Sequence, residues 1–87
     1  MTHKVRFALE VAPDREAVEA DVALAIFTAE CVYGRARARM EARYSVAADG
    51  RRCVIDVGGD AGEAAARVLA GLLAARVGEE GFSVRRD

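Results

Sequence analysis

The sequence predicts an α+β fold, in which two helices cover one face of a four-stranded antiparallel sheet and the elements follow the order βαββαβ. Two stretches, residues 4–11 and 35–46, alternate apolar and polar side chains with the period of two that half-buried strands show. Residues 49–50 are Asp-Gly, the commonest two-residue hairpin turn, and another strand follows them. Two stretches with helical periodicity, residues 13–33 and 61–77, complete the pattern.

The first predicted strand leads directly into the first helix. The apolar face of the strand consists of alternate residues, namely Val5, Phe7, Leu9 and Val11. Pro13 suits the first position of a helix, because the N–H that proline lacks would be unpaired there. Asp14 and Glu16 complement the positive end of the helix dipole, and Gly34 is well placed to end the helix after Tyr33.

This first helix carries apolar residues on two sides. One stripe is expected to face the sheet and comprises Val18, Val22, Ala25, Ile26, Ala29 and Val32. The second stripe lies on nearly the opposite side and comprises Ala20, Leu24, Phe27 and Cys31. Because a chain of 87 residues has little left to cover it, we expect Leu24, Phe27 and Cys31 to form an oligomer interface. The alternative is that a loop or the end of the chain covers this stripe.

The predicted hairpin, residues 34–57, has a self-consistent register. Folding about residues 49–50 places apolar residues opposite one another in the pairs Val46–Cys53, Tyr44–Ile55 and Ala42–Val57. Residues 35–43, however, are rich in alanine, arginine, methionine and glutamate, which are good helix formers. A first helix that runs on through Gly34 is therefore the alternative. We favour the strand, because its alternation continues in phase into the hairpin.

A glycine-rich turn follows the hairpin at residues 58–63. Asp60 with Glu63 is typical of a capping box at the start of a helix. A turn of this kind can also bind a phosphate on its backbone N–H groups. Its spacing matches no nucleotide-binding loop and no lysine follows it, so we favour a plain helix cap.

The second helix and the last strand complete the predicted fold. The core stripe of the helix comprises Ala65, Val68, Leu69, Leu72 and Leu73. Residues 81–86 form a short closing strand with Phe82 and Val84 directed inward. Strand, helix, two strands, helix and strand in this order resemble the ferredoxin-like arrangement. Because many unrelated functions use that fold, it names no activity.

The composition predicts one small folded domain over residues 1–87. Hydrophobic residues make up 53% of the chain and charged residues 31%, as in a globular domain rather than a disordered tail. The net charge is −1, so only the distribution of charge can attract a charged partner. No apolar run approaches the length of a membrane span, and the start lacks an apolar signal segment. We therefore expect a cytoplasmic protein that makes no membrane contact.

No combination of side chains is typical of catalysis, of a metal centre or of a cofactor site. His3 is expected in the N-terminal tail without a partner. Cys31 and Cys53 have no metal-binding spacing and are expected to be reduced and unpaired, with Cys31 in an apolar helical environment that leaves it inert. We therefore predict a protein that is not an enzyme and that binds neither a metal nor a cofactor.

The face of the sheet that the helices leave open is predicted to be basic. It collects Lys4, Arg6, Arg37, Arg39, Arg43, Arg52 and Arg85, diluted by Glu10, Glu41 and Asp56. Three interpretations are open: a solvated face with weak ion pairs, a binding surface, or a sheet-to-sheet dimer with the arginines at its rim. If it is a binding surface, the partner-binding residues are Arg6, Arg37, Arg39, Arg43, Arg52 and Arg85. The face lacks the aromatic side chains that stack nucleic-acid bases, so a protein partner is favoured.

The function that these features favour is a small interaction module that forms a homo-oligomer and docks to a protein or polyanionic partner. One alternative is a regulatory domain that senses a small molecule bound between subunits near residues 58–62. Another is a compact enzyme of the dimeric α+β barrel type, which normally needs a polar residue inside the barrel.

Overall fold

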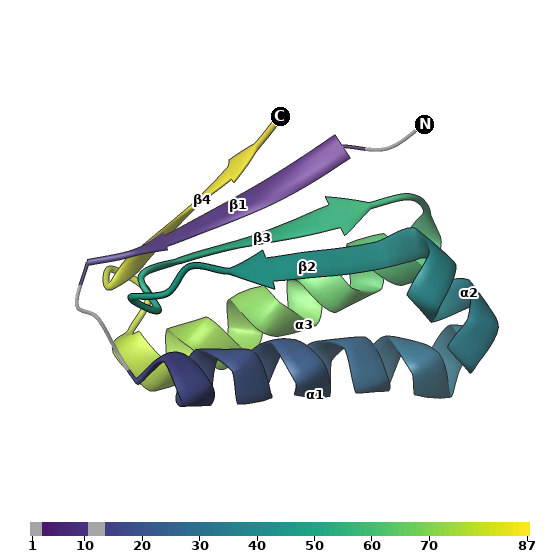
Figure 1. The fold of residues 1–87 in the computed structure, drawn as a ribbon, viewed down its shortest axis with the longest axis horizontal. Helices are drawn as coiled ribbons and strands as arrows, with labels where there is room; N and C mark the ends of the chain where they lie inside the picture. Colours follow the sequence, from purple (N-terminus) through teal and green to yellow (C-terminus); the bar gives the residue numbers. More distant parts are fainter. Residues whose placement is uncertain (1–2, 11–13) are drawn as a thin grey trace.

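The fold is known from a computed structural model, which describes residues 3–10 and 14–87 (Figure 1). The elements are β1 (His3–Leu9), α1 (Arg15–Tyr33), α2 (Arg35–Glu41), β2 (Ala42–Val46), β3 (Arg52–Val57), α3 (Asp60–Val77) and β4 (Phe82–Arg86). All four strands are antiparallel to their neighbours, in the order β2-β3-β1-β4. The fold is therefore α+β, as predicted. Val11 and Pro13, which the sequence placed in the first strand and at the first helix start, lie outside the described residues.

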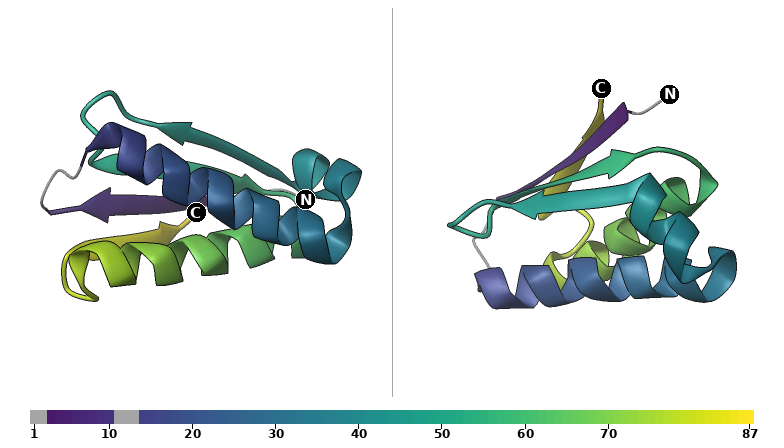
Figure 2. Two further views of the ribbon diagram at one scale, coloured as in Figure 1. Left: turned by 90° about the horizontal axis from the view of Figure 1, so that it is seen from below. Right: turned by 45° about the vertical axis from the view of Figure 1, so that its right-hand side comes forward.

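The helices lie on one face of the sheet and leave the other face open, as predicted (Figures 1 and 2). Helices α1 and α3 lie side by side, and α2 connects the end of α1 to the start of β2. The described residues form three helices rather than the two expected, so the order is βααββαβ. The chain thus departs from the ferredoxin-like βαββαβ order by one added helix.

The added helix α2 corrects the prediction of a strand over residues 35–43. Gly34 has a positive φ of 93°, a conformation that L-residues with a side chain rarely adopt. It ends α1 and starts α2, so the alternative of one continuous helix is also wrong. Within α2 the intrinsic preference of alanine and arginine for helix prevails. The side chain of Ala38 is fully buried, whereas that of Met40 is 80% exposed. In a strand both side chains would point to the same face of the sheet, so this difference in burial fits a helix.

The hairpin register is confirmed. In the β2–β3 ladder Val46 pairs with Cys53, Tyr44 with Ile55 and Ala42 with Val57. The turn differs from the Asp-Gly type expected, because within the described residues only glycines have positive φ, here Gly50 at 73°. Ala47 N–H donates to Arg52 O at 2.8 Å and Gly50 N–H donates to Ala47 O at 2.9 Å. The turn therefore spans residues 48–51.

The core lies between the sheet and the two long helices. Its largest fully buried side chains are Phe7, Ile55, Leu69, Leu73, Val5, Val18, Val22, Val57 and Cys53. Most of the predicted core stripes are thus confirmed. Val32 is 70% exposed, because it lies on the flank of its stripe in the last turn of α1. Val84 is 45% exposed, because β4 is an edge strand.

One ion pair joins the two long helices at the margin of this core. Asp21 of α1 is only 7% exposed, and it accepts hydrogen bonds from Arg76 of α3 at 2.6 and 3.0 Å. This two-point contact raises the pKa of Arg76, chiefly through the hydrogen bond to Asp21. The two residues lie 55 positions apart in the sequence, so this contact is a finding of the structure.

None of the helices within residues 3–10 and 14–87 has the length and apolar character needed to cross a membrane.

Candidate interaction surfaces

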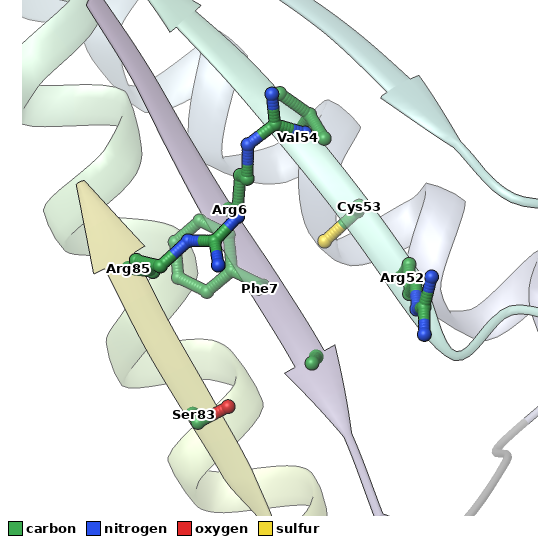
Figure 3. Close-up of a pocket in the computed structure, with 8 residues that line it drawn as sticks. Arg6, Phe7, Arg52, Cys53, Val54, Ser83 and Arg85 are labelled. Carbon is green, nitrogen blue, oxygen red and sulfur yellow. The ribbon is translucent and has the colours of Figure 1, made fainter. Parts of the chain in front are cut away.

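Three arginines surround a shallow hollow on the open face of the sheet (Figure 3). Arg6 comes from β1, Arg52 from β3 and Arg85 from β4. The small side chains of Ala8 and Ser83 lie opposite one another in the β1–β4 ladder and leave the floor low. The hollow has a volume of about 340 Å³. We call this surface, defined by its three arginines and its two small residues, the basic hollow.

The strand register explains why these arginines meet. Arg6 lies directly opposite Arg85 in the β1–β4 ladder, and like charges in that relation repel each other. Asp87 relieves the repulsion: its carboxylate lies 2.5 Å from Arg6 Nε and 3.5 Å from Arg85 Nε. The hydrogen bond from Arg6 is the main cause that lowers the pKa of Asp87. Arg52 has no carboxylate within ion-pair distance in the described part of the chain, so the hollow keeps a positive charge.

Two further basic residues extend this surface. Lys4 pairs with Asp56 at 3.0 Å, as expected of a solvated sheet face. Arg43 is exposed on β2 and lies opposite Asp56 in the register. Of the predicted partner-binding residues, the structure therefore brings four to the open face: Arg6, Arg43, Arg52 and Arg85.

The other two predicted partner-binding residues, Arg37 and Arg39, are not on the sheet. Both belong to α2, because residues 35–41 are helical. Arg37 Nε lies 2.6 Å from Glu41, and its guanidinium lies over the ring of Tyr33 at 5.2 Å. Arg39 lies 3.4 Å from Glu30 of α1. These contacts hold α2 on α1 and remove both arginines from the basic face.

The glycine-rich turn at residues 58–62 is filled by Glu41 of the same chain. Its side chain accepts a hydrogen bond from Ala61 N–H at 3.1 Å, and its carbonyl accepts one from Gly58 N–H at 2.7 Å. A Cβ on Gly62 would lie 2.1 Å from that carbonyl oxygen. The hydrogen bond from Arg37 is the main cause that lowers the pKa of Glu41. The less favoured alternative of a phosphate on this turn thus loses support, because oxygens of Glu41 already accept from the N–H groups of Gly58 and Ala61.

The predicted capping box is also wrong. The residue before α3 is Gly59, which has no side chain to cap the helix, so Asp60 is already the first helical residue. Glu63 instead pairs with Arg86 of β4, and its pKa is lowered mainly by that hydrogen bond. His3 belongs to β1 rather than to a tail, and its Nε2 lies 3.6 Å from Glu63.

The predicted oligomer residues Leu24, Phe27 and Cys31 are all exposed on α1. Leu24 is 49% and Phe27 59% exposed, so no loop covers them among the described residues. Phe27 lines a groove of about 550 Å³ that runs between α1 and β2. Tyr44 of β2 lines the same groove and is 50% exposed. The alternation predicts Tyr44 on the apolar face of the hairpin, opposite Ile55, and the exposure of its ring is a finding of the structure.

The two cysteines are free, as predicted, but their environments differ. Cys31 is exposed on α1, which corrects the expectation of an apolar environment, and Cys53 is buried in β3. Burial raises the pKa of the Cys53 thiol to about 11. In residues 3–10 and 14–87, no three histidine, cysteine or acidic side chains lie close enough together to hold a metal ion.

Comparisons with known protein families, with curated protein sequences and with solved structures give no significant match to this chain.

Proposed function

We propose that this protein is a non-enzymatic interaction module that docks an acidic segment of a partner protein on the open face of its sheet. The observation that carries the proposal is the basic hollow, in which Arg6, Arg52 and Arg85 surround a low floor of small side chains. The whole chain has a net charge of −1, so this local excess of positive charge comes from the strand register rather than from composition.

The chemistry of the hollow suits carboxylates. Asp87 already places a carboxylate between Arg6 and Arg85, and arginine binds carboxylates through two parallel hydrogen bonds. Arg52 lies on the far side of Ala8, its register neighbour, and is available to a second carboxylate. An extended peptide with acidic side chains at successive positions would therefore contact both ends of the hollow.

Nucleic acid fits this face less well. The residues of the four strands that point to the open face are Lys4, Arg6, Ala8, Arg43, Ser45, Arg52, Val54, Asp56, Ser83 and Arg85. None of these has an aromatic ring, and sheets that bind single strands stack bases on such rings. A small-molecule sensor with a site at residues 58–62 is also not favoured, because Glu41 occupies the turn.

The test is the binding of a fluorescein-labelled oligoglutamate peptide, followed by fluorescence anisotropy. Replacing Arg6, Arg52 and Arg85 together with serine should weaken binding by about tenfold or more, because charge-assisted contacts are lost. Binding to the unaltered protein should also fall steeply as salt rises, since screening acts beyond about 10 Å at 0.1 M.

The matched control replaces Arg15, Arg35 and Arg67 with serine. These residues are exposed on the helices, so the change in net charge is the same and the basic hollow is untouched. The proposal expects the control to bind as the unaltered protein does. An equal loss of affinity in both triple variants would show that overall charge alone attracts the peptide, and would contradict the proposal. Tighter binding of oligothymidylate than of oligoglutamate would show that the partner is a nucleic acid rather than a protein.

A further inference from the structure

The outer edge of β2 carries backbone groups without a strand partner. Within residues 3–10 and 14–87, β2 is an edge strand of the sheet and pairs only with β3. Ala47 N–H donates to Arg52 O, and Gly58 N–H donates to Glu41 O, so the odd-numbered residues of β2 point their backbone groups at β3. Since these groups alternate in direction along an antiparallel strand, those of Tyr44 and Val46 point outward. Ala42 adds an outward carbonyl, because its N–H is bound to Ala38 O.

The side chains of the same three residues lie on the helix face of the sheet. Their partners in β3 are the buried residues Val57, Ile55 and Cys53. Tyr44 nevertheless remains 50% exposed, and beside it across the groove Phe27 of α1 is 59% exposed. Free backbone groups and uncovered aromatic rings therefore lie along one edge of the molecule.

We propose that a second copy of this chain covers this edge, by antiparallel pairing of β2 with the partner's β2 about a two-fold axis at Tyr44. The two sheets join into one of eight strands. Tyr44 of each copy then lies beside the partner's Tyr44 on the helix face, and the groove that contains Phe27 closes between the two α1 helices. This proposal is independent of the docking of an acidic partner.

The register follows from the residues of β2. With the axis at Tyr44, all three outward-pointing residues find partners: Tyr44 pairs with the partner's Tyr44, and Ala42 with the partner's Val46. Arg43 then lies opposite the partner's Ser45 on the open face. An axis at Arg43 would place two arginines opposite one another, which is unfavourable. An axis at Ser45 would leave Ala42 without a partner.

A second copy fits this edge because the edge is complementary to itself, which a two-fold interface requires. A stable interface buries about 800 Å² on each partner, a substantial part of the 5254 Å² accessible surface of this chain. A strand of five residues cannot supply that area alone, whereas the exposed rings of Phe27 and Tyr44 and the side chain of Leu24 add apolar surface beside it. The opposite edge, β4, carries two exposed arginines, Arg85 and Arg86, whereas β2 carries one, Arg43. Such charges protect an edge from pairing, so β4 is the better protected of the two edges.

The same pairing of β2 strands would place the basic hollows of the two copies on one side of the dimer. A two-fold axis perpendicular to the sheet keeps the open faces of both copies on the same side. The dimer would therefore present two hollows, with Arg43 of each copy between them, on one continuous surface.

Disulfide trapping tests the register. In a Cys31→Ser background, Tyr44→Cys places the new cysteine of one chain directly opposite the same cysteine of the second chain. Their Cα atoms then lie about 5.5 Å apart, a separation that a disulfide spans. In the control Ser45→Cys, the new cysteines of the two chains lie diagonally across from each other, roughly 7 to 8 Å apart. A disulfide does not form at that separation without backbone movement. Under mild oxidation, Tyr44→Cys should give a covalent dimer on a non-reducing gel and Ser45→Cys should stay a single chain. A dimer from Ser45→Cys instead, or from both equally, would overturn the register.

The molar mass in solution tests the dimer itself. Light scattering at micromolar concentration should return about 18.6 kDa, twice the 9.3 kDa of one chain. Val46→Pro should reduce the mass to one chain with unchanged circular dichroism, because it removes an outward N–H and no bond to β3. Phe27→Glu should do the same from the helix side, where the fold tolerates the change because the ring is exposed. A mass near 9.3 kDa for the unaltered protein, or a dimer that survives both substitutions, would overturn the proposal.

Discussion

The side chain of Glu41 accepts a hydrogen bond at 3.1 Å from the backbone N–H of Ala61, 20 residues further along the chain. This contact joins the end of α2 to the start of α3 and places a carboxylate at the positive end of the α3 dipole. Arg37, one turn earlier in α2, holds the same carboxylate at 2.6 Å. A single side chain thus couples the helix that the sequence did not predict to one that it did.

Removing this contact should lower the stability of the fold. Glu41→Ala loses the cap on α3 and the pair with Arg37, whereas Glu41→Gln keeps an oxygen that can accept from Ala61 N–H. We expect the urea midpoint, followed by circular dichroism, to fall in the order unaltered protein, Glu41→Gln, Glu41→Ala. Glu79→Ala, in the exposed turn after α3, is the control that should leave the midpoint unchanged. Equal midpoints for Glu41→Ala and the control would show that the contact does not stabilise the fold.

Acid should destabilise the protein. The pKa values of Glu41, Glu63 and Asp87 lie below their ordinary values of 4.5, 4.5 and 3.8 in the folded state, mainly through hydrogen bonds from Arg37, Arg86 and Arg6. A lowered folded pKa means that the unfolded state takes up protons first, so the stability these groups contribute is complete at neutral pH. It should decline as the pH falls below about 4.5 and on through the lower folded values. Urea midpoints between pH 7 and pH 2.5 measure this, and a midpoint that stays level or rises in acid would contradict it.

Two glycines of α3 should respond to alanine in opposite ways. A Cβ on Gly62 would meet the carbonyl oxygen of Glu41 at 2.1 Å, so Gly62→Ala should cost at least about 2 kcal/mol of unfolding free energy. Gly71 is exposed in the middle of the same helix and has no atom within 4 Å of such a Cβ. Gly71→Ala should therefore raise the unfolding free energy by about 0.5 to 1 kcal/mol. If both substitutions had the same effect in urea titrations, the close approach of α2 to α3 would be wrong.

The two thiols should differ in reactivity. Cys31 is exposed, whereas Cys53 is buried and its thiol pKa is raised to about 11. Only the thiolate reacts with Ellman's reagent, so at pH 8 Cys31 should react in the folded protein and Cys53 only after unfolding in denaturant. The variant Cys31→Ser should give no signal until denaturant is added. A rapid signal from that variant while folded would show that β3 is more open than the structure has it.

Much of the sheet could be predicted from the sequence. The pairing of Tyr44 with Ile55 follows from two features together. The turn at residues 49–50 sets the register, and the alternation excludes a shift of one residue, which would turn every apolar side chain outward. The arginines of the sheet face, Arg6, Arg52 and Arg85, could be predicted for the same reason. The low floor between them could not, because it depends on Ala8 meeting Ser83 across strands that are distant in sequence.

What the sequence determined by itself is therefore the local pattern: which residues of β1, β2 and β3 face inward, and where α1 and α3 run. The tertiary structure decided the conformation of residues 35–41, because their alternation favours a strand whereas their composition favours a helix, so the local sequence gives no unique answer. Ala38 fits the buried side of either, so local hydrophobicity does not discriminate between them. The helix places Glu41 at the start of α3, a contact between segments far apart in sequence. That contact also decided which arginines lie on the open face, since Arg37 and Arg39 turn with the helix and pair with acidic residues of the helical layer.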